Sequence, residues 1–116
     1  MISAWIDEIK KTADRDGLGM ILVHNGIVRG TSKKGDPVRR MRLSCDKGRL
    51  ERLLSEQRKK EGILDIRAWI NSGEVTIGDD IMFLLVAGRF RTDALPVFET
   101  VLSTIKNEIV HEEEIP

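Results

Sequence analysis

The residue types that this sequence has in short supply already limit what it can be. Its 116 residues include one cysteine, two histidines, three prolines, no tyrosine and few aromatic rings, three from Phe and two from Trp. The single cysteine, Cys45, excludes an internal disulfide and is typical of a protein in a reducing cytoplasm. Because rings are scarce, Leu, Ile and Val must fill most of the core.

Long apolar runs and net charge are also missing. No apolar run approaches the roughly 20 residues that a membrane helix needs. The N-terminal MISAWIDEIKK carries acids where an export signal needs basic and apolar regions, so we expect no export signal. Since 19 Lys and Arg balance 19 Asp and Glu, bulk nucleic-acid binding is disfavoured. His24 and His111 lack ligand-spaced partners, so we expect no metal site.

Apolar periodicity predicts one α+β domain over residues 1–116 with a largely antiparallel sheet and flanking helices. Helices are expected from Ile2 to the DRDGLG segment, from about Lys47, and from about Asp93. Strands are expected at residues 20–30, 38–45, 63–70, 74–77 and 81–88. The last strand is apolar on both faces and is therefore expected at the centre of the sheet. Residues 109–116 are expected to form an acidic, solvated tail.

Three finer expectations concern helix caps and one strand face. Ser3 and Asp93 are expected to be the N-caps of their helices. Period-two alternation predicts that one face of the 63–70 strand is buried. The residues expected on that face are Leu64, Ile66, Ala68 and Ile70.

Basic residues are concentrated in one part of this neutral chain. The bases between positions 29 and 49 are Arg29, Lys33, Lys34, Arg39, Arg40, Arg42, Lys47 and Arg49, against Asp36 and Asp46. Most of the bases from position 38 onward are expected to face water. Arg29 ends a strand, and Arg91 lies at a helix start, where free N–H groups favour anions. Lys106 lies roughly 20 Å further along that helix, so only a chain reversal or a second chain could join it to Arg91.

Three segments, taken in order, resemble one known family. They are GIVRGTSKKGDPV, SGEVTIGDDIMFLLVAGRFRTDAL and IKNE. They are similar to the large, catalytic subunit of molybdopterin synthase, the MoaE family, which has a strand ending G-x-V-R, a segment I-G-E-L-x-x-G-D-E, an H-R-x-x-A-F turn and a helix ending in L-K. The resemblance covers about Gly19 to Asn107, most of the chain.

The resemblance implies an α/β hammerhead fold with an extra antiparallel sheet. It also implies an enzyme, a sulfurtransferase of molybdenum cofactor biosynthesis, with no permanently bound cofactor and a cyclic pyranopterin monophosphate as substrate. The sulfur would come from a thiocarboxylate at the Gly-Gly C-terminus of a ubiquitin-like small subunit. Two large subunits would form a homodimer within a heterotetramer in the cytoplasm, with neither a membrane nor a nucleic acid as partner.

The resemblance also implies roles for individual residues. Lys106 would be the catalytic lysine beside the thiocarboxylate. Arg29 and Arg91 would hold the substrate's phosphate or the incoming carboxyl terminus. The further candidates for substrate binding are Lys33, Lys34, Arg89 and Arg39.

Two departures from the family pattern favour a second hypothesis. Phe90 stands where the family has His, and Glu113 stands where it has a second lysine. The alternative is a non-catalytic relative that serves as a binding or regulatory module. A third hypothesis is a small RNA-binding domain that uses residues 29–49. It predicts strong salt dependence, but the segment lacks aromatic rings for stacking on bases.

Overall fold

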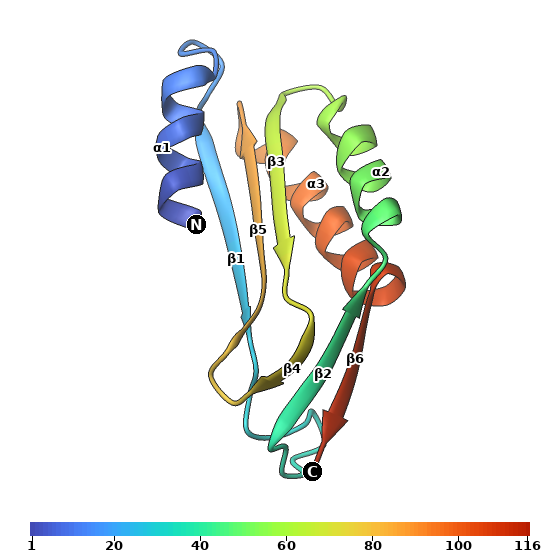
Figure 1. The fold of residues 1–116 in the computed structure, drawn as a ribbon. Coiled ribbons are helices and arrows are strands. Elements are labelled where there is room, and N and C mark those ends of the chain that lie inside the picture. Colours follow the sequence, from blue (N-terminus) through green and yellow to red (C-terminus); the bar gives the residue numbers. More distant parts are fainter.

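The computed structural model describes residues 1–116 as a mixed α+β fold (Figure 1). In chain order the elements are α1 (Ile2–Thr12), β1 (Met20–Ile27), β2 (Arg40–Cys45), α2 (Lys47–Arg58), β3 (Ile63–Ile70), β4 (Gly73–Thr76), β5 (Asp80–Gly88), α3 (Arg91–Thr104), a π-helical turn η1 (Ile105–Ile109) and β6 (Val110–Ile115). All strand pairs are antiparallel, which confirms the predicted fold class. None of the helices has the length and apolar character needed to cross a membrane.

The first sheet has the strand order β1-β5-β3, so β5 is central, as its apolar sequence predicts. Both of its faces are covered. On one face, Ile9 of α1 packs against Leu85 and Ala87. On the other, α2 and α3 cover Leu84 and Val86 (Figure 1). This burial explains why β5 carries almost no polar side chain.

The second sheet has the order β4-β2-β6 and contains the largest departure from the prediction. On β2, Met41 and Leu43 are buried while their neighbours are exposed, so its side chains alternate between core and solvent. The acidic end of the chain is strand β6 rather than a solvated tail. Adjacent carboxylates disfavour a strand by themselves. Here Arg42 of β2 lies opposite Glu113 and forms an ion pair with it at 3.5 Å.

Both predicted helix caps are wrong. Helix α1 begins at Ile2, one residue before Ser3. Helix α3 begins at Arg91 and has no side-chain cap at all. Its expected cap, Asp93, lies inside the first turn and accepts a hydrogen bond from Arg89 Nε at 3.3 Å. Arg89, four residues earlier, therefore binds the Asp93 carboxylate, which the sequence predicts to cap the helix.

The predicted buried face of β3 is right except at Leu64. The register between β3 and β5 shifts between Ile63 and Asp65. Such an irregularity moves a side chain to the opposite face of the sheet. Leu64 accordingly packs in the cluster under α1, while Ile66, Ala68 and Ile70 face the main core as predicted.

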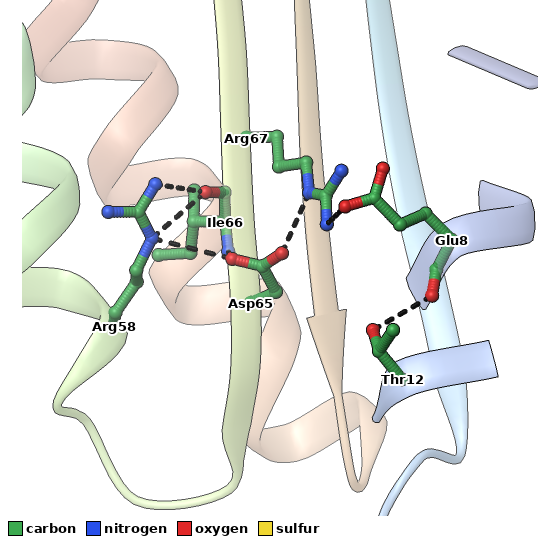
Figure 2. Close-up of polar contacts among 6 residues, drawn as sticks. All are labelled: Glu8, Thr12, Arg58, Asp65, Ile66 and Arg67. Atoms are coloured by element: carbon green, nitrogen blue, oxygen red, sulfur yellow. Dashed lines mark hydrogen bonds and ion pairs between the residues drawn. The ribbon is translucent and has the colours of Figure 1, made fainter. Parts of the chain in front are cut away.

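A network of charged side chains crosses the β3 edge of the first sheet (Figure 2). The Asp65 carboxylate accepts a hydrogen bond from Arg67 Nε at 2.8 Å and lies 3.4 Å from Arg58 Nε of α2. Arg67 also donates to Glu8 of α1 at 3.2 Å. These bonds, led by the one to Asp65, raise the pKa of Arg67. The network joins α1, β3 and α2.

Removal of the Asp65 carboxylate should lower the free energy of unfolding by about 1–2 kcal/mol, because two partly buried guanidinium groups lose their shared acceptor. Urea unfolding of Asp65→Ala measures this loss. The control is Glu99→Ala, an exposed residue of α3 without a side-chain partner, which should change stability by less than about 0.5 kcal/mol. Equal stabilities for the two variants would contradict the prediction.

Candidate functional site

The segment between β1 and β2 forms a closed loop that carries four of the predicted site residues, Arg29, Lys33, Lys34 and Arg39. The Ser32 hydroxyl accepts hydrogen bonds from the backbone N–H groups of Lys34 and Asp36, at 3.3 and 3.1 Å. Arg29 Nε donates to the Thr31 carbonyl at 3.0 Å. This polar segment folds into an internal hydrogen-bonded turn that presents Lys33 and Lys34 at its tip.

Lys106 lies on the π-helical turn η1, which connects α3 to β6. Ile105 and Ile109 are buried and anchor the turn in the core. Arg49 of α2 binds it from outside, donating to both the carbonyl and the carboxylate of Glu108 at 2.9 Å. π-turns in helices occur often at functional sites, and this one fixes the base of the Lys106 side chain.

The loop, the π-turn and β6 surround an open cavity of about 510 Å³. Ile27, Met41 and Ile81 supply its apolar lining. Its charged lining residues are Arg29, Lys33, Lys34, Lys106, Asp36, Glu112 and Glu114. Basic groups from the loop and from the π-turn therefore converge on one cavity, which can attract an anion, while acids of the same chain partly balance them.

Lys106 is already paired inside this cavity. Its Nζ atom forms a close ion pair with the carboxylate of Glu112 on β6. Strand alternation places Glu112 and Glu114 on the cavity side, whereas Glu113 lies on the opposite side with Arg42. The acid that matches the family's second lysine by position is therefore outside the cavity.

Three of the predicted binding residues lie away from the cavity. Arg89 pairs with Asp93 and Glu61 and lies 4.9 Å above the ring of Phe90. Arg91 is the first residue of the 14-residue helix α3, so it is about 21 Å from the end that leads to Lys106. Arg39 is exposed before β2 and is not a lining residue. Within one chain the structure brings together Arg29, Lys33, Lys34 and Lys106.

The sequence reasoning missed the acidic half of the site, Asp36, Glu112 and Glu114. The available signal was the spacing of Glu112 and Glu114, two residues apart, which places them on one face of a strand. The composition of the acidic run points instead to a solvated tail, which has no fixed faces. The same expectation hid the pairing of Lys106.

The basic segment of residues 38–49 is largely neutralised by the chain itself. Arg40 pairs with Glu74 of β4 at 2.9 Å, Arg42 with Glu113 of β6, and Arg49 with Glu108. The five bases of this segment were expected to face water, and all are exposed, but three of them, Arg40, Arg42 and Arg49, also have an acidic partner. This pairing leaves little free charge here for an RNA backbone.

His24 of β1 is electrostatically linked to Lys106. Partial burial, followed by the positive charge of Lys106, lowers the pKa of His24 below its usual value. The ring is therefore neutral at physiological pH. No group of three His, Cys, Asp or Glu side chains is placed to hold a metal ion.

The pKa of His24 should rise in Lys106→Ala, but only part of the way to its ordinary value, because burial of the ring remains. An NMR titration of the imidazole signals measures this shift. The depressed pKa also means that His24 supports folding fully above about pH 6.5 and that this support declines as the pH falls through the lower, folded-state pKa. An unchanged His24 titration in the variant would contradict the link.

The geometry defines a small α+β protein with a cavity at the junction of two antiparallel sheets, lined by four basic and three acidic side chains. Solved structures with this fold include the molybdopterin synthase from Staphylococcus aureus, 20% identical with a TM-score of 0.75 over 94% of this chain and 82% of that one. Another is the complex of subunits 1 and 2 of molybdopterin-converting factor from Helicobacter pylori 26695, 18% identical with a TM-score of 0.75 over 97% and 74%.

The family follows from the sequence match. Residues 3–108 match the MoaE protein family, so the chain belongs to that family and the resemblance is confirmed. Among individual proteins, the uncharacterized protein MJ0717 of Methanocaldococcus jannaschii is 29% identical over 92 residues, which are 76% of this chain and 77% of that protein. Family and fold together associate the chain with molybdenum cofactor biosynthesis.

Proposed function

We propose that this protein is the large subunit of a molybdopterin synthase. It accepts sulfur from the C-terminal thiocarboxylate of a ubiquitin-like small subunit and transfers it to cyclic pyranopterin monophosphate. The observation that carries this proposal is the convergence of Arg29, Lys33, Lys34 and Lys106 on one cavity in a member of the MoaE family. The single, partly buried cysteine fits a reducing cytoplasmic setting.

Each basic group has a physical role in this reaction. When the acyl carbon of the small subunit's tail gives up its sulfur, negative charge develops on the acyl oxygen, and a fixed ammonium such as Lys106 stabilises it. Arg29 offers paired planar donors suited to phosphate or carboxylate, and Lys33 and Lys34 add point charges from the loop above. The substrate is the anion, and no resident cofactor is needed.

Arg91 fits the proposal only in an assembly. It lies at the opposite end of α3 from Lys106, so we place it in the cavity of a second copy within a homodimer. Arg89 and Arg39 are weaker candidates. Arg89 is held by Asp93 and Glu61, and Arg39 does not line the cavity. The proposed assembly is a heterotetramer with two small subunits. The Helicobacter pylori complex of two subunits supports a partner of this kind.

A second candidate function is a non-catalytic binding or regulatory module. One observation favours it: Lys106 is held in an ion pair by Glu112, so it is not free for chemistry in this state. Phe90 in place of the family's His also removes a polar group, and this residue is 59% exposed on the surface. This candidate keeps the cavity and its ligand but forms no product.

A single-turnover assay separates the two functions. The purified protein is mixed with cyclic pyranopterin monophosphate and a thiocarboxylated small subunit, and dithiolene product is followed in time. Product formation supports the enzyme. Measurable binding of the pterin or the small subunit without product supports the module, and neither binding nor product would reject both.

A further inference from the structure

The ion pair between Lys106 and Glu112 differs from the other ion pairs that involve glutamate. The Glu112 side chain is 27% exposed, against 43–88% for the five other paired glutamates. It is also held by the backbone, because Glu112 lies opposite Leu43 in the β2–β6 ladder. The carboxylate is therefore directed into the cavity by the fold and placed on the ammonium group.

The group that Glu112 presents has the chemistry of the proposed reactant. A protein's C-terminal tail ends in a carboxylate, or in a thiocarboxylate when it is loaded with sulfur. Both are planar anions of one negative charge, like the Glu112 side chain. Lys106 can bind either anion through the same donors.

From this geometry we propose that Glu112 is an internal competitor for Lys106, which the carboxylate or thiocarboxylate of an incoming tail must displace. The inference rests on the proposed function, since it assigns the tail to the Lys106 end of the cavity. Exchange of one carboxylate for another keeps Lys106 neutralised throughout. The released Glu112 remains in a cavity with Lys33 and Lys34, which have no ion-pair partner of their own.

Such a competitor makes the site selective for charged chain ends. A tail that ends in a neutral amide cannot replace the carboxylate, so Glu112 stays on Lys106 and the tail gains nothing there. A tail that ends in an anion makes the exchange and loses only the small net energy of a partly exposed ion pair. Removal of Glu112 should therefore strengthen binding of anionic tails threefold to tenfold, roughly the range that such pairs represent.

The test measures binding of two fluorescent peptides that end in Gly-Gly, one as the free carboxylate and one as the amide. Fluorescence anisotropy is recorded for the wild type, Glu112→Gln, Glu114→Gln, Lys106→Ala and the double variant Lys106→Ala/Glu112→Gln. Glu114→Gln is the matched control, because it removes the same charge from the same cavity on the same strand without releasing Lys106. Both Gln variants preserve side-chain size, and circular dichroism verifies their fold.

We expect Glu112→Gln to bind the carboxylate peptide threefold to tenfold more tightly than the wild type, and Glu114→Gln to change it less than twofold. The amide peptide should bind all variants alike, and the gain should vanish in the double variant. Four results would overturn the proposal. They are equal gains for the two Gln variants, a gain that persists without Lys106, weaker binding by Glu112→Gln than by the wild type, and no binding of the carboxylate peptide by either the wild type or Glu112→Gln.

The outcome is distinguishable from failure of the proposed function. A wild type that forms dithiolene product while Glu112→Gln behaves like Glu114→Gln is an enzyme without an internal competitor. A wild type that forms no product while Glu112→Gln alone gains affinity has the competitor in a binding module. The two assays thus report separately.

Discussion

Lys106→Ala is expected to slow dithiolene formation in a single turnover by about 10²- to 10³-fold, the usual effect of removing one preorganised donor from a developing negative charge. The side chain reaches the cavity from a turn whose two isoleucines are buried, so its position is fixed before the substrates arrive. The measurement is the product formed against time, with enzyme in excess over the pterin substrate.

A matched lysine tests whether this loss is specific. Lys11 lies exposed in the last turn of α1, remote from the cavity, and has no ion pair. Lys11→Ala removes the same charge and should leave the rate within about twofold of the wild type, as expected for a surface substitution that touches no special feature. If the wild type and Lys106→Ala form product at equal rates, Lys106 has no role in the mechanism.

The largest effect on stability is expected at Gly19, just before β1. A Cβ atom there would lie 2.1 Å from the carbonyl oxygen of Arg89, and the Gly19 N–H donates to Gly88 at 2.9 Å. The clash involves backbone on both sides, so no side-chain rotation relieves it. Gly19→Ala should lower the free energy of unfolding by about 3 kcal/mol, at the upper end for overpacking.

Gly48 provides the opposite result with the same chemical change. It lies in the first turn of α2, where an added Cβ would meet side-chain atoms no closer than 3.5 Å. Alanine is favoured over glycine in a helix, so Gly48→Ala should stabilise the protein by about 0.5 kcal/mol. Urea unfolding of both variants is the measurement. A Gly19→Ala protein as stable as the wild type would mean that the β1 entry can shift away from Arg89.

The sequence predicts the core of the fold well because the core depends on local apolar spacing. The central position of β5, the burial of Ile66, Ala68 and Ile70 on β3 and the three α-helices all follow from which side chains must avoid water. The helix caps and Leu64 were predicted wrongly, because each depends on a competing local interaction or on a register shift that periodicity does not report.

The candidate site was only half predictable for a related reason. Arg29, Lys33, Lys34 and Lys106 are recognisable as bases near strand or helix ends, and they do share the cavity. Two of the acids that face them, Glu112 and Glu114, lie on β6, and the composition of this segment disfavours a strand. The segment forms β6 because β2 supplies an edge for strand pairing and the opposite charge of Arg42. Both depend on the tertiary structure and not on local sequence.

The π-turn at residues 105–109 affects how this chain can be compared with its relatives. A π-turn accommodates one more residue than the α-turn it replaces, and a shift of one residue in the following strand exchanges its two faces. An alignment without a gap after Lys106 pairs the family's second lysine with Glu113, which lies outside the cavity beside Arg42. Relative to a homologue whose helix ends in an ordinary α-turn, the cavity-facing positions of β6 would be displaced by one. Residue-by-residue alignment beyond Ile105 would then match inward side chains with outward ones.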